Sequence, residues 1–389
     1  MLELLFLLLP VAASYGYVMG RNSVRQAQRK QSSILSRHYY RGLNFLLSDQ
    51  PDKAVDTLMK MINLDSDTVE THIAMGNFFR HRGELDRAIR VHQNLVSKAE
   101  LSESQNLQAL RELGKDYMLA GFLERAENAF LQLLDSEKHF LDAQQQLFSI
   151  YQTTKEWDRA IELGERMMNC HGDSDDLCNR ISHFYCEQAL KKIKSEEYGD
   201  AESSLQKAIT CDEHAVRPWL ILGELAIKQN DYQQAFNYLK EVPIRDVSWF
   251  SEAVPLLEKC TKELNSDEQL DGLLEQYWQQ CATSYLAKVR LIAKNKSTEE
   301  AEKVLFEQLS KTPTMKGFRT LMGFFIEDEV DDKTKESLTM VKGLVEEQIK
   351  LRPKYRCHSC GFSGRQIHWL CPSCKKWGVV KPIKGLDGE

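Results

Sequence analysis

The chain has 389 residues, of which only 20 are Gly and 9 are Pro, so turns are few and helices are expected. Hydrophobic residues make up 42% and charged residues 28%, a balance that excludes a disordered chain and a multi-span membrane protein. The net charge of −6 conceals basic ends: residues 21–41 and 351–389 carry +6 each, Glu3 carries −1, and residues 42–350 therefore carry −17. An acidic body of this kind excludes nucleic-acid binding over most of the surface.

The first predicted element is a membrane anchor at residues 1–20, which contain a single charge, Glu3. As a helix, the nineteen residues 2–20 would be about 28 Å long, close to the roughly 30 Å of a hydrocarbon core. A cleaved signal peptide is the alternative, because Val11-Ala12-Ala13 resembles a cleavage site. All the positive charge follows the apolar run, which favours an anchor with a cytoplasmic body. The basic segment 21–34 either contacts anionic lipid or serves only as a topology signal.

Residues 35–350 are predicted to form an all-α array of tetratricopeptide repeats. A small residue is followed twelve positions later by Ala in the pairs Gly42–Ala54, Gly76–Ala88, Gly114–Ala126 and Gly223–Ala235. The first two pairs are 34 residues apart, and the same separation joins Ala126 to Ala160 and Ala201 to Ala235. A period of 34 residues is typical of two antiparallel helices per repeat. Gly and Ala allow the two helices to cross closely. We expect repeats near 35–68, 69–102, 107–140, 141–174, 182–215, 216–249 and 282–315, with degenerate pairs at 250–281 and 316–350.

Such arrays usually bind a peptide or protein on the face formed by the first helix of each repeat. The positions that normally line this face hold, in the second and third repeats, Asn77, Arg80, His81, Arg111 and Lys115. This local basic cluster would suit an acidic segment or a C-terminal carboxylate. The alternative is that these are ordinary solvated side chains.

The segment 351–389 is predicted to be a small metal module. Its cysteines follow the pattern C-x2-C-x10-C-x2-C, which is typical of one tetrahedral zinc or iron ion. The four predicted ligands are Cys357, Cys360, Cys371 and Cys374. Gly361 follows the first pair, where positive φ is expected, whereas Lys375 occupies the equivalent place after the second pair. Tyr355, Phe362, Trp369 and Trp377 are expected to supply the small core of the module.

The cysteines have two alternative uses. A pair of disulfides is disfavoured because the inferred cytoplasm is reducing. A second metal site is suggested by Cys170, His171, Cys178, His183 and Cys186. Their spacing fits no compact ligand pair, and free cysteines are common inside helical arrays. The sequence therefore favours a single metal site with four cysteine ligands.

The MLELLFLLLPVAA start, the basic stretch, the repeats and the YRCHSCGF…HWLCPSCKKW…KPIKGLDG segment together resemble the lipopolysaccharide assembly protein B family of Gram-negative bacteria. The resemblance covers the whole chain and implies a single-pass inner-membrane protein with cytoplasmic repeats. It also implies a rubredoxin-type metal domain on Cys357, Cys360, Cys371 and Cys374. The family is expected to promote proteolysis of the lipid A pathway deacetylase LpxC by the membrane protease FtsH. It is also expected to gather other lipopolysaccharide synthesis and assembly proteins at the membrane.

Two other classes of function are compatible with the sequence. The metal module could be a rubredoxin-like electron carrier, or a zinc ribbon that binds nucleic acid through its +6 charge. Neither class explains the anchor. The positive charge of residues 351–389 is better explained if this tail packs on the acidic array. Common catalytic motifs are missing from the sequence, so a non-enzymatic protein is favoured. No nucleic-acid partner is expected, and homo-oligomerisation is left open.

Overall fold

The computed structural model describes residues 69–389 except 100, 172–173 and 329–330, together with the isolated residues 19 and 45. The chain divides into two compact units, residues 1–150 and 151–389, and each is described by itself. The predicted anchor, the basic segment 21–34 and the Gly42–Ala54 repeat lie outside the described residues and stay predictions. Within the described part, none of the helices combines the length and the apolar character needed to cross a bilayer.

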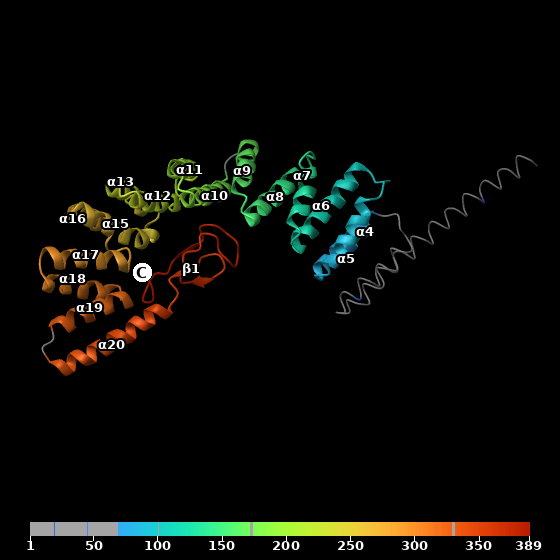
Figure 1. The fold of residues 1–389 in the computed structure, drawn as a ribbon. Coiled ribbons are helices and arrows are strands. Elements are labelled where there is room, and N and C mark those ends of the chain that lie inside the picture. Colours follow the sequence, from blue (N-terminus) through green and yellow to red (C-terminus); the bar gives the residue numbers. More distant parts are fainter. Residues whose placement is uncertain (1–18, 20–44, 46–68, 100, 172–173, 329–330) are drawn as a thin grey trace, which may run out of the picture. The chain divides into compact units, whose positions relative to one another are not determined.

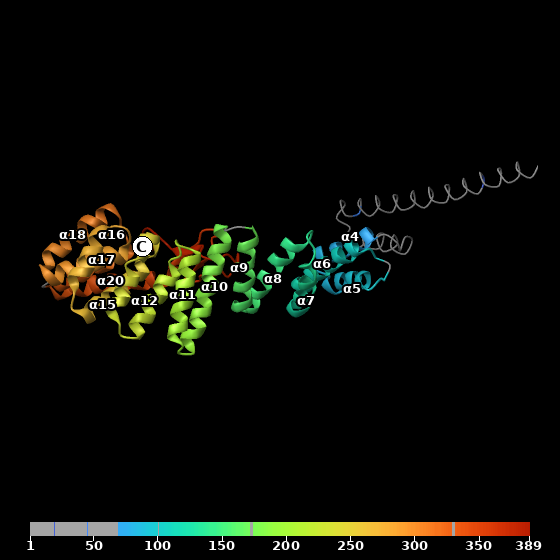
Figure 2. The same ribbon diagram turned by 90° about the horizontal axis from the view of Figure 1, so that it is seen from above.

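Helices follow one another in antiparallel pairs through both units (Figures 1 and 2). The first unit contains α4 (Val69–His81), α5 (Leu85–Val96), α6 (Glu103–Ala120), α7 (Leu123–Leu133) and the start of α8 (Phe140–Thr154). The second unit continues with α9 (Trp157–His171), α10 (Asp175–Lys194), α11 (Tyr198–Cys211), α12 (Arg217–Lys228), α13 (Tyr232–Leu239), α14 (Val242–Arg245), the 3-10 helix η1 (Val247–Trp249), α15 (Phe250–Leu264), α16 (Asp267–Tyr277), α17 (Ala282–Asn295), α18 (Thr298–Lys311), α19 (Met315–Asp328) and α20 (Asp332–Leu351). The prediction of a mostly helical, tetratricopeptide-like fold is confirmed.

The recurring glycines permit close crossing of the two helices in a pair. A Cβ atom on Gly76 would lie 2.3 Å from the His92 ring. One on Gly114 would lie 2.9 Å from Phe130, and one on Gly223 would lie 2.5 Å from Leu239. In all three pairs the obstructing side chain lies sixteen residues after the glycine, four residues beyond the paired alanine. The sequence-based reason for the Gly–Ala spacing is therefore confirmed at each of these positions.

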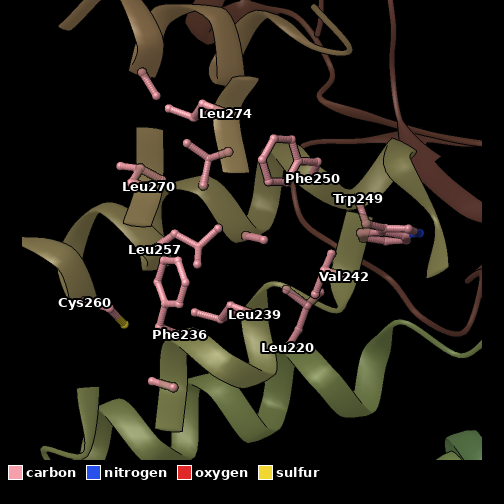
Figure 3. Close-up of a cluster of buried hydrophobic side chains, with 14 of the residues drawn as sticks. Leu220, Phe236, Leu239, Val242, Trp249, Phe250, Leu257, Cys260, Leu270 and Leu274 are labelled. Carbon is pink, nitrogen blue, oxygen red and sulfur yellow. The ribbon is translucent and has the colours of Figure 1, made fainter. Parts of the chain in front are cut away.

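Neighbouring helical pairs bury apolar side chains against each other, as stacked repeats must. In the second unit, buried side chains of α12, α13, α15 and α16 form a single cluster (Figure 3). Its members include Leu220, Phe236, Leu239, Phe250, Leu257 and Leu274. Trp249 of η1 lies at the edge of this cluster, beside the C-terminal module.

The C-terminal module is a three-stranded antiparallel sheet with the order β2-β1-β3. The strands are β1 (Tyr355–Cys357), β2 (Ser363–Gly364) and β3 (Val380–Pro382). Tyr355, Cys357, Cys371 and Val380 form the buried core of the module, and Phe362 packs against it. Trp369 packs instead against the helical cluster described above.

The prediction that Trp369 and Trp377 belong to the core of the module is therefore wrong. So small a module cannot enclose two indoles on its own, whereas the neighbouring helices offer aromatic and cationic partners. In Figure 1 the module lies beside α10, α12 and α15 of the second unit.

Candidate metal centre

The two cysteine pairs bring four sulfur atoms into one cluster. All four Sγ atoms lie within 4.8 Å of one another. Cys357 Sγ is 3.7 Å from Cys374 Sγ, and Cys360 Sγ is 3.7 Å from Cys371 Sγ. Four sulfurs placed tetrahedrally around one zinc or iron ion would be about 3.8 Å apart. The donor set and its geometry fit a single thiolate-bound ion.

The same backbone turn builds both halves of the cluster. In the first half, Gly361 N–H donates to the Cys357 carbonyl at 3.0 Å, and Gly361 has φ +78°. In the second half, Lys375 N–H donates to the Cys371 carbonyl at 3.0 Å, and Lys375 has φ +57°. Lys375 thus adopts the left-handed conformation expected of a glycine, at a cost of about 1 kcal/mol. The turn therefore keeps its conformation although Lys375 replaces the expected glycine.

Backbone N–H groups and burial act in opposite directions on the four thiols. Hydrogen bonding from the Phe362 backbone lowers the pKa of Cys360 to about 6, and the Lys376 backbone likewise lowers the pKa of Cys374. Burial raises the pKa of Cys371 to about 11. Thiolates are the species that bind a soft metal. A bound ion must therefore displace the proton of Cys371, whereas the lowered pKa of Cys360 favours its thiolate.

The second metal site considered from the sequence finds no support in the described residues. Among them, the cluster of four sulfurs is the one group of three or more potential metal ligands. His183 is buried with its Nδ1 3.4 Å from the Arg217 guanidinium, which would repel a metal ion. Burial also raises the pKa of Cys186 to about 12, so its thiol keeps its proton. The side chains of Cys170 and His171 lie outside the described part of the chain.

Trp377 anchors the metal module to the helices. Its indole stacks on the His183 ring, with centroids 4.9 Å apart and an interplanar angle of 21°. Its Nε1–H donates to Gln152 Oε1 at 3.1 Å. The Arg217 side chain is only 3% exposed and lies over both Trp377 and Trp369, at 5.7 and 5.5 Å from their ring centroids. These cation–π contacts, together with Glu187 at 2.6 Å, stabilise the buried guanidinium.

A second group of contacts joins the module to α15 and η1. Trp369 stacks on Trp249 with centroids 4.4 Å apart. Tyr355 donates its hydroxyl hydrogen to Glu252 at 2.7 Å. Lys381 pairs with Asp246 at 2.8 Å. The prediction that the basic tail packs on the acidic array is therefore confirmed.

The predicted groove residues lie close together in the first unit, where acids match their charges. Arg80 pairs with Glu112 at 2.6 Å and with Asp116 at 3.0 Å, and it also contacts Asn77. Lys115 reaches Glu112 at 3.3 Å. Arg111 pairs with Asp142 at 2.5 Å, whereas His81 is exposed. The acids come from α6 and α8. The ion pairs therefore connect the first helices of successive repeats.

The repeat pattern alone does not reveal these acids as partners, because their pairing with the cations depends on how the helices cross. Burial opposes ionisation of Glu112, but hydrogen bonding from Arg80 and the charge of Lys115 outweigh it and hold the pKa of Glu112 below its usual value. Asp116 is fully buried and also contacts His92 Nδ1. Arg80 is therefore the partner that these two buried carboxylates share.

Arg80→Gln should destabilise the first unit by about 3 kcal/mol, because the buried carboxylates of Glu112 and Asp116 would lose the guanidinium that pairs with both of them. Hydrogen exchange of α4 and α6 amides should measure this loss. Arg90→Gln removes the same charge from an exposed position on α5 and should change exchange little. Equal changes in hydrogen exchange for the two substitutions would contradict a stabilising role for the ion pairs of Arg80.

Acidification should weaken the same unit. The pKa of Glu112 is lowered in the folded state, so its ionised form contributes stability above the unfolded-state pKa. That contribution is lost as the pH falls through the folded-state pKa. Thermal unfolding of the full chain measured from pH 7 down to pH 3 should therefore show a loss of stability below about pH 4.5, smaller in Glu112→Gln.

Comparison with known proteins extends these observations to the whole chain. Residues 355–382 match the family model of a rubredoxin metal-binding domain, and residues 71–104 match a tetratricopeptide repeat. Lipopolysaccharide assembly protein B of Escherichia coli strain K12 is 40% identical over 390 residues, covering 100% of both chains. The protein of that name from Haemophilus influenzae strain KW20 is 37% identical over 397 residues, again covering 100% of both.

Solved structures are similar to part of the chain. A crystal structure of MamA is 19% identical, covers 47% of this chain and 94% of its own, and has a TM-score of 0.34. The Pseudomonas aeruginosa pilF structure is 16% identical, covers 60% of this chain and 99% of its own, and has a TM-score of 0.31. It is the full-length identity to the curated relatives that assigns the chain: it belongs to the lipopolysaccharide assembly protein B family.

Proposed function

We propose that this chain is a non-enzymatic inner-membrane adaptor that regulates lipopolysaccharide biosynthesis. In this proposal it promotes FtsH-mediated proteolysis of the deacetylase LpxC and helps to organise other lipopolysaccharide assembly proteins. The observation that carries the proposal is the 37–40% identity, over the full length, to relatives named for lipopolysaccharide assembly. A tetratricopeptide array, whose usual activity is protein binding, supports the adaptor role.

The proposed anchor at residues 1–20 would place adaptor and protease in one membrane. Confinement to a common membrane raises the effective concentration of two proteins, so weak contacts suffice for a productive complex. Deleting this segment should therefore reduce LpxC turnover even if the array and the module stay folded. Full turnover by the truncated protein would argue against co-anchoring.

In the proposed adaptor, the metal module gives the second unit a rigid composite surface. One ion of zinc or iron, held by Cys357, Cys360, Cys371 and Cys374, would keep the strands in place. The strands in turn hold Trp369 and Trp377 against α10, α12 and η1. The bound metal supplies structural cross-linking in this role. Metal analysis of the purified chain distinguishes a colourless zinc protein from a red iron protein.

The proposal is tested by co-purification from detergent-solubilised membranes, followed by mass spectrometry. We expect the intact chain to recover FtsH, LpxC or other lipopolysaccharide synthesis proteins, and Cys371→Ser to lose them. Cys211→Ser, which makes the same chemical change outside the module, should retain them. LpxC half-life in cells, measured for the same variants, should lengthen only with Cys371→Ser. Normal LpxC turnover with the metal-free variant would refute the metal-dependent adaptor.

The groove residues Asn77, Arg80, His81, Arg111 and Lys115 are a separate proposal for a partner-binding surface. Their charges are already matched by Glu112, Asp116 and Asp142, so a partner would have to compete with these acids or use the exposed His81. Because Arg80 and Lys115 both stabilise the buried Glu112 carboxylate, His81→Ala is the sharper binding test. Loss of partner recovery at unchanged thermal stability is the expected result if this face binds the partner.

A further inference from the structure

A pocket outside the metal cluster lies between the C-terminal sheet and η1. Its volume is about 430 Å³, within the range of roughly 300–1,000 Å³ that is typical of small-molecule sites. It is lined by residues of strands β1 and β3, by the residues that follow β3, and by Asp246 and Ser248. The pocket is therefore built from the docked module and the helical array together.

The strand register concentrates positive charge on the pocket wall. Arg356 of β1 pairs directly with Lys381 of β3 in the antiparallel ladder. The neighbouring residues Tyr355, Cys357 and Val380 are buried, so Arg356 and Lys381 face away from the module core. Like charges directly opposite each other destabilise a strand pair. Asp246 pairs with Lys381 only, so a bound anion beside Arg356 would relieve the repulsion that remains.

The acids near the pocket neutralise only part of its charge. Asp246 is the one acid among the lining residues, and its carboxylate already engages Lys381 at 2.8 Å and Ser248 N–H at 2.9 Å. Within the described part of the chain, no ion pair engages Arg356 or Lys384. The pocket consequently keeps two unmatched cations, and the His358 ring lies beside them.

We propose that this pocket binds the phosphate group of a phosphomonoester. The planar Arg356 guanidinium can donate two parallel hydrogen bonds to phosphate oxygens, and Lys384 adds a second full charge. Pro382 and Ile383 line the same pocket and offer an apolar surface to the carbon skeleton of the ligand. The volume exceeds what inorganic phosphate alone requires, which favours a phosphate carried on a small organic group.

The charge of the rest of the molecule favours a compact ligand over a polyanion. Residues 42–350 carry −17 and would repel a nucleic acid that extended beyond the pocket. A single phosphate group fits within the basic wall. Its source is either a soluble phosphorylated metabolite or the headgroup of a phospholipid. The site requires neither FtsH nor LpxC and so extends beyond the adaptor function proposed above.

Calorimetric titration of the purified full chain with glycerol 3-phosphate, at low ionic strength, tests the soluble source. Glycerol is the uncharged control ligand. We expect saturable binding that weakens as salt is added, and a loss of at least about 10-fold in affinity for Arg356→Gln combined with Lys384→Gln. Lys333→Gln with Lys350→Gln removes the same charge from α20 and should bind like the unaltered chain. Circular dichroism and metal content should be equal in all variants, and Lys384→Gln alone serves if the double variant misfolds.

Flotation of the same variants with liposomes tests the lipid source. Liposomes of phosphatidylcholine are compared with liposomes that also contain phosphatidic acid, whose headgroup is a phosphomonoester. Extra flotation on phosphatidic acid that depends on Arg356 and Lys384, without binding of glycerol 3-phosphate, would assign the pocket to a lipid headgroup. If neither probe distinguishes the pocket variant from the α20 variant, the proposal is overturned.

Discussion

Replacing Cys371 with serine should unfold the C-terminal module while most of the helical array stays folded. The module core contains few buried residues besides the two inner cysteines, and structural metal sites contribute on the order of 10 kcal/mol to such small folds. Loss of one thiolate ligand therefore exceeds what the remaining core can supply. Tryptophan fluorescence should shift to longer wavelength as Trp369 and Trp377 enter water. Helical circular dichroism should fall only slightly.

Proteolysis provides a second readout of the same change. Cys371→Ser, or the unaltered chain after chelation of its metal, should be cut rapidly between residues 352 and 389. Cys211→Ser should resist cleavage in that segment, because Cys211 ends α11 and lies outside the sulfur cluster. A metal-free chain with an intact, protease-resistant module would show that the strands and the docking contacts suffice without the ion.

Trp377→Ala should weaken the docking of the module on α10 and α12 without unfolding its metal centre. Removing a buried tryptophan typically costs about 3–5 kcal/mol, and here it also removes the stacking on His183 and the cation–π contact with Arg217. Amides of α10 and α12 should exchange faster, while metal content stays at the level of the unaltered chain. Trp377→Phe keeps an aromatic ring and should recover part of the protection. Equal exchange in Trp377→Ala and the unaltered chain would contradict the anchoring role.

The docking of the module on the helices should depend on pH because His183 lies in the contact. Burial, and then the nearby charge of Arg217, hold the pKa of His183 well below its usual value. The undocked state therefore takes up a proton at a higher pH than the docked state. Docking should weaken as the pH falls below about 6.5, the usual pKa of histidine. NMR titration should show the pKa of His183 rising toward that value in Trp377→Ala.

The sequence predicted those parts of the molecule whose signal is local or periodic. The spacing of Gly76, Gly114 and Gly223 predicted the repeats because each glycine opposes a large side chain sixteen residues later. The two C-x2-C turns predicted the sulfur cluster because a tight turn directs both thiols toward one point. Even the Lys375 turn follows this local rule, with positive φ in place of a glycine.

The contacts between distant segments could not be predicted in this way. His183, Arg217 and Trp249 have no shared spacing with Trp369 and Trp377, and their contacts exist only once the array has stacked. The charge of Arg80 was visible in the sequence, but its pairing with Asp116 depends on the crossing of α4 and α6. The composition shows a positive tail and a negative array. These opposite charges were enough to predict that the two attract each other.

The contact between Trp377 and Gln152 has a consequence for the order of events during synthesis. These residues are 225 positions apart, and at about 5–20 residues per second a ribosome needs roughly 10–45 s to make the intervening chain. During the later part of that interval the helices that contain His183 and Arg217 have emerged and fold without the indole that later covers them. A nascent chain therefore presents this aromatic- and cation-binding surface to its surroundings for tens of seconds before its own C-terminal residues can occupy it.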